Sequence, residues 1–220
     1  MRLAPCSLRC APCARRAEVV PWKSLTQCGR WCLGVLVVKC LGLLMIFTET
    51  ELKGAFVIEP ERREDPRGFF ARTWCEKEAV AHGINPQIVQ CNISFNRGKG
   101  TLRGMHYQKP PFAEAKLVRC TMGAVHDVII DLRPDSPTFK RHIAVVLTAE
   151  NRTMLYIPDG FAHGFQTLTD NTEVFYQMSQ VYSPDAAAGV RWNDPAFRID
   201  WPPDERIMNE RDQTYPDFKG

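Results

Sequence analysis

From residue 56 onward, short apolar stretches alternate with turn-forming residues, and this rhythm limits the possible folds more than any other feature. Stretches of alternating hydrophobicity that end at Gly, Pro, Asn or Asp are typical of β-strands rather than helices. Before the C-terminal segment, only residues 76–82 (EKEAVAH) have a helical pattern. The predicted strands are residues 56–59, 69–74, 88–95, 102–108, 116–122, 124–132, 141–147, 152–157, 164–167 and 173–182.

Many short strands at this spacing predict an all-β fold. A closed barrel or a jelly roll suits such a pattern, because both arrangements hide the edges of the sheets. We expect one of these two arrangements with short flanking helices, and a small ligand would bind in its interior. Asp131 and Arg133 bracket a turn at the end of an apolar strand. We interpret these two charges as a structural corner.

The first 44 residues differ from the rest of the chain in charge and in cysteine content. They carry seven basic residues and one acid, a charge of +6, so the remainder carries −3 of the net +3. A mildly acidic domain has no electrostatic reason to bind nucleic acid. Six of the nine cysteines also lie within the first 40 residues. The other three, Cys75, Cys91 and Cys120, are scattered and predict reduced thiols in a cytoplasmic protein.

Four interpretations of residues 1–44 remain open. Residues 31–47 are apolar and suggest a signal anchor, although about 17 residues with Lys39 near the middle are short for a membrane span. Cysteine pairs at 10–13 and 28–32 resemble a zinc ribbon, and the acid-poor composition resembles a transit peptide. We favour the fourth, a start codon assigned too far upstream. It predicts a disordered extension over 1–44 and a single domain over 45–220.

Three polar clusters interrupt the apolar strands. In LRGMHYQ (102–108), strict alternation places Gly104, His106 and Gln108 on one face and Arg103 with Tyr107 on the other. A lone histidine in a strand is more often a packed core residue than a catalyst. The second cluster, EAK (114–116), brings a lysine into an apolar strand, where most lysines are solvated. The third, IPDGFAH (157–163), ends a turn with a histidine. None of the three establishes a function alone.

Together the motifs resemble those of the dTDP-4-dehydrorhamnose 3,5-epimerase family. The resemblance runs in order from about residue 45 to 218 and leaves 1–44 outside. The matching segments are RGFF (67–70), LRGMHYQ (102–108), KLVRC (116–120), DLRPDSPTF (131–139), IPDGFAHGF (157–165), WNDP (192–195) and WP (201–202). PDGFAH (158–163) also resembles the second half of the cupin signature.

The resemblance implies a cupin-like jelly-roll barrel that works without a metal or other cofactor. It also implies a homodimer in which strands are shared and the N-terminal part of the domain supplies residues to the neighbour's site. The expected partner is a nucleotide sugar, with no nucleic acid and no membrane for the core domain.

The implied reaction is epimerisation of a 4-keto-6-deoxy nucleotide sugar at C3, C5 or both. In that family dTDP-4-dehydro-6-deoxy-D-glucose becomes dTDP-4-dehydro-L-rhamnose. Such a reaction needs a base that removes a proton beside the carbonyl, a group that stabilises the enolate oxygen, and an acid across the ring. The matching positions imply His106 as the base, Asp212 as its partner, Lys116 at the enolate and Tyr176 as the acid.

The same resemblance implies a set of substrate-binding residues. Two arginines suit the diphosphate, because a guanidinium group pairs with phosphate oxygens, and a phenylalanine can stack on the base. The set is Arg67, Phe70, Gln90, Asn92, Arg103, His163 and Tyr182. Family members with a dTDP-specific site often carry an acid where this chain has Arg72. The nucleotide base, the sugar and the epimerised carbon therefore stay open.

Two other functions fit the same fold. A metal-dependent cupin usually supplies an H-x-H pair, a Glu and a later His. Here that pair reads His106-Tyr-Gln108, so only His106 and His163 remain, with Glu114 a poor third ligand. A non-catalytic nucleotide-sugar binding protein predicts that the base or the acid has been lost, whereas all four implied catalytic residues are present. A metal-free epimerase is therefore the function we expect.

Overall fold

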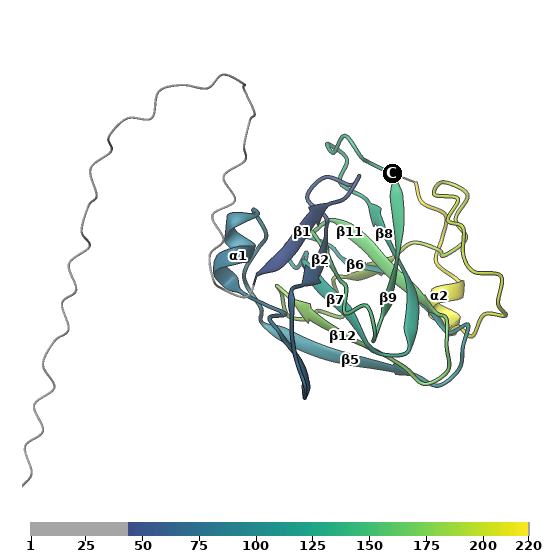
Figure 1. Cartoon of the computed structure of the whole chain (residues 1–220). Coiled ribbons are helices and arrows are strands. Elements are labelled where there is room, and N and C mark those ends of the chain that lie inside the picture. The colour runs from purple at the N-terminus through teal and green to yellow at the C-terminus, as the bar shows by residue number, and fades with distance from the viewer. Residues whose placement is uncertain (1–43, 220) are drawn as a thin grey trace, which may run out of the picture. The chain divides into compact units, whose positions relative to one another are not determined.

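The computed structural model describes residues 44–219. The four interpretations of residues 1–44 therefore concern a segment that lies almost entirely outside the described range. The described residues form two antiparallel sheets (Figure 1). The six-stranded sheet has the order β1 (Met45–Glu49), β2 (Phe56–Pro60), β10 (Met154–Ile157), β7 (Lys116–Met122), β12 (Thr172–Met178) and β5 (Gln90–Asn96). The five-stranded sheet has the order β13 (Ala187–Gly189), β6 (Leu102–Gln108), β11 (Phe161–Thr167), β8 (Ala124–Asp131) and β9 (His142–Thr148).

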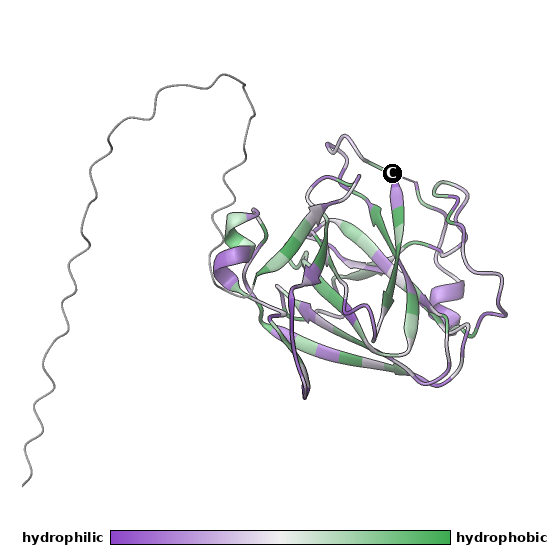
Figure 2. Ribbon diagram, viewed as in Figure 1, coloured by the Kyte–Doolittle hydropathy of each residue, from purple (hydrophilic) through white to green (hydrophobic). Residues whose placement is uncertain are grey.

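Three smaller elements complete the described part of the chain. Strands β3 (Arg62–Asp65) and β4 (Gly68–Ala71) form an exposed hairpin outside the two sheets. Helix α1 (Glu76–Ala81) follows the hairpin, and helix α2 (Glu210–Gln213) lies near the C-terminus. Figure 2 shows hydrophobic residues along the strands of the two sheets, whereas α2 is largely hydrophilic.

Alternation along the strands produces the core between the two sheets. Inward side chains such as Val118 and Val174 from one sheet contact Val125 and Phe161 from the other in one buried cluster. These side chains fill part of the space between the sheets, and polar side chains line the rest. Because apolar burial stabilises by about 25 cal/mol per Å², this cluster holds the two sheets together.

The outer faces of both sheets are also covered, which explains why several strands are apolar on both sides. Phe197 and Trp201 of the C-terminal segment pack against Val128 and Met105 on the outside of the five-stranded sheet. Ala79 of α1 joins a cluster on the outside of the six-stranded sheet. The C-terminal segment is thereby held against β6.

The all-β prediction is confirmed, and helix α1 was also predicted. β6 and β7 have the predicted bounds, whereas the predicted strand over 69–74 is too long and the one over 164–167 is too short. β1, β3 and β13 were not predicted. β3 (RRED) has no apolar residue to mark it, and β13 (AAG) is too short to show a period.

Strict alternation is wrong for β6, because the strand contains a β-bulge. His106 pairs with His163 and Arg103 with Phe165, so β6 has one extra residue between these pairs. The bulge turns Arg103 toward the same side as His106. Gly104 lies in the bulge with φ +127°, and a Cβ there would lie 2.5 Å from the Cα of Gly164. Only glycine fits such a backbone.

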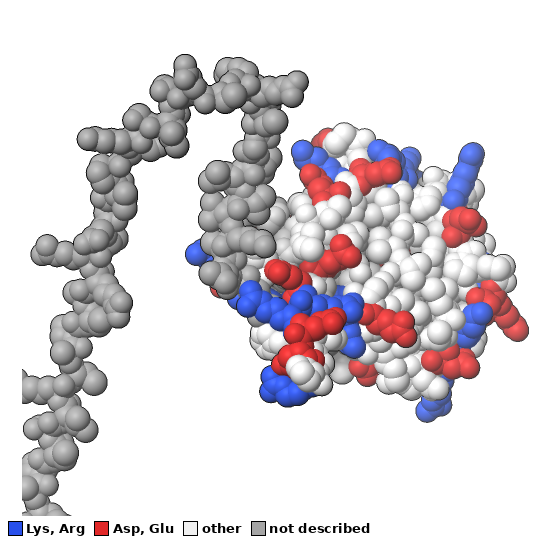
Figure 3. Space-filling model, in the orientation of Figure 1, with Lys and Arg blue, Asp and Glu red and all other residues white. Residues whose placement is uncertain are grey.

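The structure also tests the predictions for the Asp131 turn and for the three cysteines of the domain. Asp131 accepts hydrogen bonds from Arg133, Ser136 and Thr138, which confirms the structural corner. Cys75, Cys91 and Cys120 carry free thiols, as predicted. Where the surface is visible in Figure 3, basic and acidic side chains lie interleaved rather than in a patch of one sign. In residues 44–219, no helix has the length and apolar content needed to cross a bilayer.

Candidate active site

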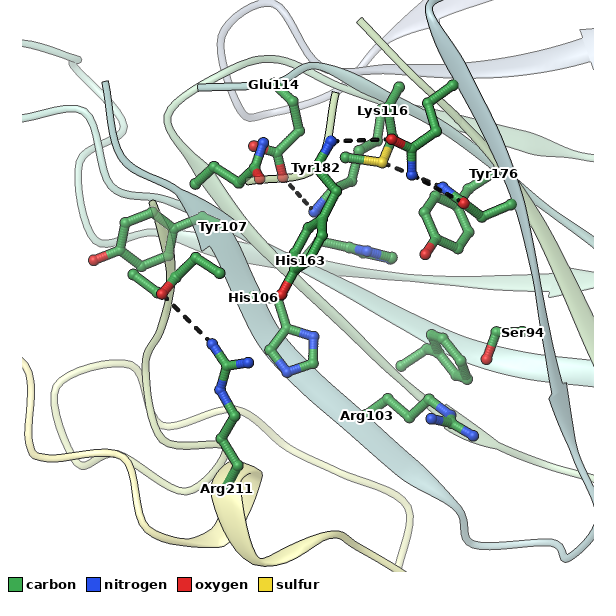
Figure 4. Close-up of a pocket in the computed structure, with 17 residues that line it drawn as sticks. Ser94, Arg103, His106, Tyr107, Glu114, Lys116, His163, Tyr176, Tyr182 and Arg211 are labelled. Carbon is green, nitrogen blue, oxygen red and sulfur yellow. Dashed lines mark hydrogen bonds and ion pairs between the residues drawn. The ribbon is translucent and has the colours of Figure 1, made fainter. Parts of the chain in front are cut away.

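A cavity of about 400 Å³ lies between the two sheets, a size suited to a small polar ligand (Figure 4). Its two walls come from different sheets. Strands β6 and β11 of the five-stranded sheet supply His106 and His163, and strands β7 and β12 of the six-stranded sheet supply Lys116 and Tyr176. His106 and Tyr176 therefore reach the cavity from opposite walls.

His106 is held by Asp212, which the C-terminal segment brings to β6. Nε2 of His106 donates to Oδ1 of Asp212 at 2.7 Å, and the backbone N–H of Gly104 donates to Oδ2 at 3.1 Å. Asn209 caps α2 by accepting a bond from the Asp212 backbone N–H at 2.7 Å, which fixes the position of the carboxylate.

The carboxylate of Asp212 is ionised although its side chain is only 1% exposed. Burial raises the pKa of Asp212, but the hydrogen bond from His106, the charge of His106 and the Gly104 N–H together bring that pKa below its usual value. An ionised carboxylate is an acceptor only, so the proton lies on Nε2 and Nδ1 of His106 is free to accept one. His106 has the arrangement of an oriented general base.

Lys116 extends into the cavity from the start of β7. Its Nζ lies 2.9 Å from Oε1 of Glu114, and both side chains are almost fully buried. Figure 4 shows this pair in the wall next to Tyr182. One N–H of the ammonium group is directed at Glu114, which leaves two for an oxygen of a bound molecule.

Tyr176 is a protonated phenol facing the cavity. Burial raises the pKa of Tyr176, and although Arg103 lowers it, the charge of Glu114 raises it further. A tyrosine whose pKa is raised stays protonated at neutral pH and can donate a proton. Tyr176 therefore suits the role of an acid facing His106.

Two other cavity residues, His163 and Gln108, form hydrogen bonds to groups of the protein. Nε2 of His163 donates to both carboxylate oxygens of Asp127 at 3.0 Å. Gln108 donates from Nε2 to the carbonyl of Phe112 at 2.8 Å, and its Oε1 accepts from the Ser183 backbone at 2.6 Å. In residues 44–219, no three His, Cys, Asp or Glu side chains are grouped as metal ligands would be.

The predicted polar residues of β5 lie at the edge of the cavity. Gln90 donates to Asn92 at 3.0 Å and accepts from the Tyr182 backbone N–H at 3.0 Å. Arg103 donates from Nε to Oδ1 of Asn96 at 2.7 Å, and its remaining guanidinium N–H groups are available to a ligand. Eight of the predicted site residues line the cavity, and Asp212 contacts His106 from behind the wall, so all but two are brought together.

The two exceptions are Arg67 and Phe70, which lie on the exposed β3–β4 hairpin and do not line the cavity. The Arg67 side chain is 89% exposed and pairs with Asp65. Phe70 is 68% exposed. Arg72, the residue that departs from the family pattern, forms an ion pair with Glu78 of α1.

Several cavity residues were not predicted as site residues, among them Glu114 and Arg211. For Glu114 a signal existed, because a residue two positions before Lys116 in extended chain lies on the same face. In the sequence alone, Glu114 stands out only as a poor metal ligand. Arg211 precedes Asp212, and its guanidinium donates to the Ala187 carbonyl at the cavity wall. No local pattern places it there.

Most of this chain matches a known protein family. Residues 49–220 match the family model described as dTDP-4-dehydrorhamnose 3,5-epimerase. The chain belongs to this family. The Shigella flexneri dTDP-4-dehydrorhamnose 3,5-epimerase is 41% identical over 167 residues, covering 74% of this chain and 91% of that protein.

Solved structures of similar proteins share the cupin-like β fold. The Bacillus anthracis dTDP-4-dehydrorhamnose 3,5-epimerase, solved with TDP and PPi bound, has a TM-score of 0.77 and 41% identity, covering 80% of this chain and 100% of that chain. A 3′-monoepimerase from Streptomyces bikiniensis in complex with dTDP-quinovose has a TM-score of 0.71 and 34% identity, covering 76% and 85%.

Proposed function

We propose that this chain epimerises a dTDP-linked 4-keto-6-deoxy sugar, converting dTDP-4-dehydro-6-deoxy-D-glucose into dTDP-4-dehydro-L-rhamnose. The observation that carries the proposal is the opposed pair of His106 and Tyr176. Inversion of a carbon centre requires removal of a proton from one face of the sugar ring and its return to the other face. A base and an acid on opposite walls of one cavity supply this geometry.

At each carbon the proposed reaction has two proton transfers and no net change in composition; His106 then releases its proton to solvent and Tyr176 regains one, and inversion at both C3 and C5 repeats the cycle. Nδ1 of His106 takes the proton from the carbon beside the ketone, and the electron pair of that C–H bond moves into the carbonyl as an enolate. The Lys116 ammonium stabilises the enolate oxygen, and Asp212 stabilises the imidazolium. Tyr176 then donates its proton to the opposite face of the same carbon, and the ketone forms again.

The nucleotide part of the substrate is proposed on different residues. The guanidinium of Arg103 suits a diphosphate, and Gln90 and Asn92 offer amide groups at the cavity edge. TDP is bound in the Bacillus anthracis enzyme, and this supports a thymidine nucleotide for the present chain. The relatives include both 3,5-epimerases and a 3′-monoepimerase, so the epimerised carbon must be measured.

The test is NMR spectroscopy of the 4-keto sugar nucleotide in deuterium oxide. We expect deuterium to enter at C3, at C5 or at both, and the rate to fall to background in His106→Ala. Parallel reactions with the corresponding uridine and guanosine sugar nucleotides show which nucleotide base the protein accepts. If the wild-type protein exchanges no hydrogen on any of these nucleotides, the proposed function is wrong. Stoichiometric iron, manganese or zinc whose removal abolished exchange would favour the metal-dependent cupin.

We also propose that the functional unit is a homodimer in which Arg67 and Phe70 reach the cavity of the neighbouring copy. The hairpin of one chain leaves both side chains exposed. The edge strand β5, which carries Gln90 and Asn92 on its inner side, exposes Ile93 on its outer side to 62%. An apolar edge beside an open cavity suits a second copy of the chain.

Subunit mixing tests this assembly. We expect Arg67→Ala and His106→Ala homodimers each to lose most activity. In a mixed dimer, one cavity would combine an intact His106 with an intact hairpin from the other copy. Random mixing then restores about a quarter of wild-type activity, since half the dimers are mixed and each has one complete site. No recovery on mixing would place Arg67 outside the neighbour's site.

A further inference from the structure

Glu114 stands out in the cavity wall because it is an almost fully buried carboxylate with no role in the proposed reaction. Its Oε1 lies 2.9 Å from Nζ of Lys116. Its Oε2 is buried and has no hydrogen-bond partner among the described residues. A buried carboxylate oxygen without a partner is costly, so a donor is expected to satisfy it when the cavity is filled. Hydroxyl groups of a hexose are such donors.

The surroundings of Lys116 give the first half of the argument. Glu114 is the one acidic partner of Lys116 among the residues that the structure describes. Other charged groups around the cavity are Arg103 and Arg211, which are cationic and cannot accept a bond from an ammonium. A buried ammonium without a carboxylate beside it is uncompensated and can rotate, and an ammonium that is not held at the carbonyl stabilises an enolate oxygen less than a fixed one does.

On the basis of the proposed epimerisation, we propose that Glu114 is a positioning residue. One oxygen of its carboxylate orients the Lys116 ammonium and fixes Nζ at the substrate carbonyl, and the other accepts a hydrogen bond from a sugar hydroxyl. The pair then acts as a unit: the substrate supplies the donor that Glu114 lacks, and the ammonium directs its remaining N–H groups at the enolate oxygen.

The position of Tyr176 is consistent with this role. The charge of Glu114 helps to raise the pKa of Tyr176, so the same carboxylate also favours the phenol over the phenolate. A carboxylate at 114 thus acts on the proton donor as well as on the enolate-stabilising group. A neutral amide at this position would weaken both effects without a change in side-chain size.

The experiment compares Glu114→Gln with Glu114→Asp, Lys116→Met and the Glu114→Gln/Lys116→Met double variant. Turnover and deuterium exchange are measured with the dTDP 4-keto sugar, and binding of dTDP alone is measured by calorimetry. Glu173→Gln is the matched control. Glu173 lies on β12, the same strand as Tyr176, and accepts from Thr121 at 2.7 Å without lining the cavity.

We expect Glu114→Gln to lower kcat about 10- to 100-fold and to raise KM for the sugar nucleotide a few-fold through the lost hydroxyl contact, with the affinity for dTDP, which lacks the hexose, within about twofold of wild type. Glu114→Asp, which retains the charge, should recover part of the loss. In the Lys116→Met background, measured over long incubations, Glu114→Gln should change exchange by less than about threefold, because the two residues act together. The control should match the wild type.

Other outcomes overturn the proposal. Wild-type turnover in Glu114→Gln excludes the positioning role while leaving the proposed function intact. If the rate losses of Glu114→Gln and Lys116→Met multiply in the double variant, Glu114 does not act through Lys116. A parallel loss of dTDP binding and thermal stability assigns Glu114 to the framework of the cavity. If the wild-type protein shows no deuterium exchange at all, the proposed function is wrong and so is the positioning role of Glu114.

Discussion

Replacing Asp212 by Asn tests whether the His106–Asp212 pair provides the base. Asparagine has one acceptor oxygen where aspartate has two. If that oxygen accepts the Gly104 N–H bond, the amide NH₂ faces Nε2 of His106. Nε2 must then be the acceptor, and the proton moves to Nδ1. The nitrogen that faces the substrate would carry a proton and could no longer take one.

The size of the effect follows from the 2.7 Å contact between His106 and Asp212. A unit charge pair at this distance has an energy of about 6 kcal/mol at an effective dielectric constant near 20. The His106 side chain is 42% exposed, so solvent screens part of this interaction. About half of that energy, near 3 kcal/mol, corresponds to a rate loss of about 100-fold. The wrong tautomer adds to the loss, and we expect a total of about 10³ in kcat.

The assay is the initial rate of deuterium incorporation into the 4-keto sugar, followed by NMR spectroscopy at several pH values. Binding of dTDP should change little, because Asp212 lies behind His106 rather than in the cavity wall. Asp204→Asn is the matched control, since Asp204 forms a surface ion pair with Lys99. If Asp212→Asn retained more than about a third of the wild-type rate, neither the charge nor the tautomer would matter, and the assignment of His106 as an Asp-oriented base would be wrong.

Two further predictions concern the acid and the stability of the fold. Tyr176→Phe should retain proton abstraction but lose reprotonation from the opposite face, so deuterium exchange should continue while the yield of epimerised product falls at least about tenfold. Asp131→Asn should be destabilised by about 2 kcal/mol at neutral pH. Burial raises the pKa of Asp131, but hydrogen bonds from Arg133, Ser136 and Thr138 lower it from 3.8 to about 2. That stability is fully present above pH 3.8 and is lost as the pH falls through about 2, as denaturant unfolding over this range can measure.

Each of these two predictions has an outcome that contradicts it. Equal product yields from Tyr176→Phe and the wild type would assign the acid to another group. For Asp131, the difference in unfolding free energy between the variant and the wild type should shrink as the pH falls from 5 toward 2. A difference that stayed constant over this range would show that the Asp131 charge contributes nothing to stability.

Much of the fold was predictable because its signals are local. The apolar alternation and the turn residues that end β6 and β7 appear directly in the chain, and both strands have their predicted bounds. β3 and β13 were missed because one has no apolar residue and the other is too short. The predicted face of Arg103 was wrong because the bulge inserts one residue of β6 against β11. A glycine at position 104 is compatible with a bulge, but the sequence does not show that the close approach of Gly164 in β11 makes glycine necessary there.

The β architecture and, through resemblance, the residue types of an epimerase site can be predicted from the amino-acid sequence. Which of those residues meet depends on the tertiary packing. Asp212 reaches His106 from 106 positions away because apolar residues of the C-terminal segment cover the outside of the five-stranded sheet. Arg67 and Phe70 do not reach the cavity of their own chain, because the hairpin that carries them projects from the sheets. Local patterns fix strands, whereas contacts between distant residues depend on how buried surfaces pack against each other.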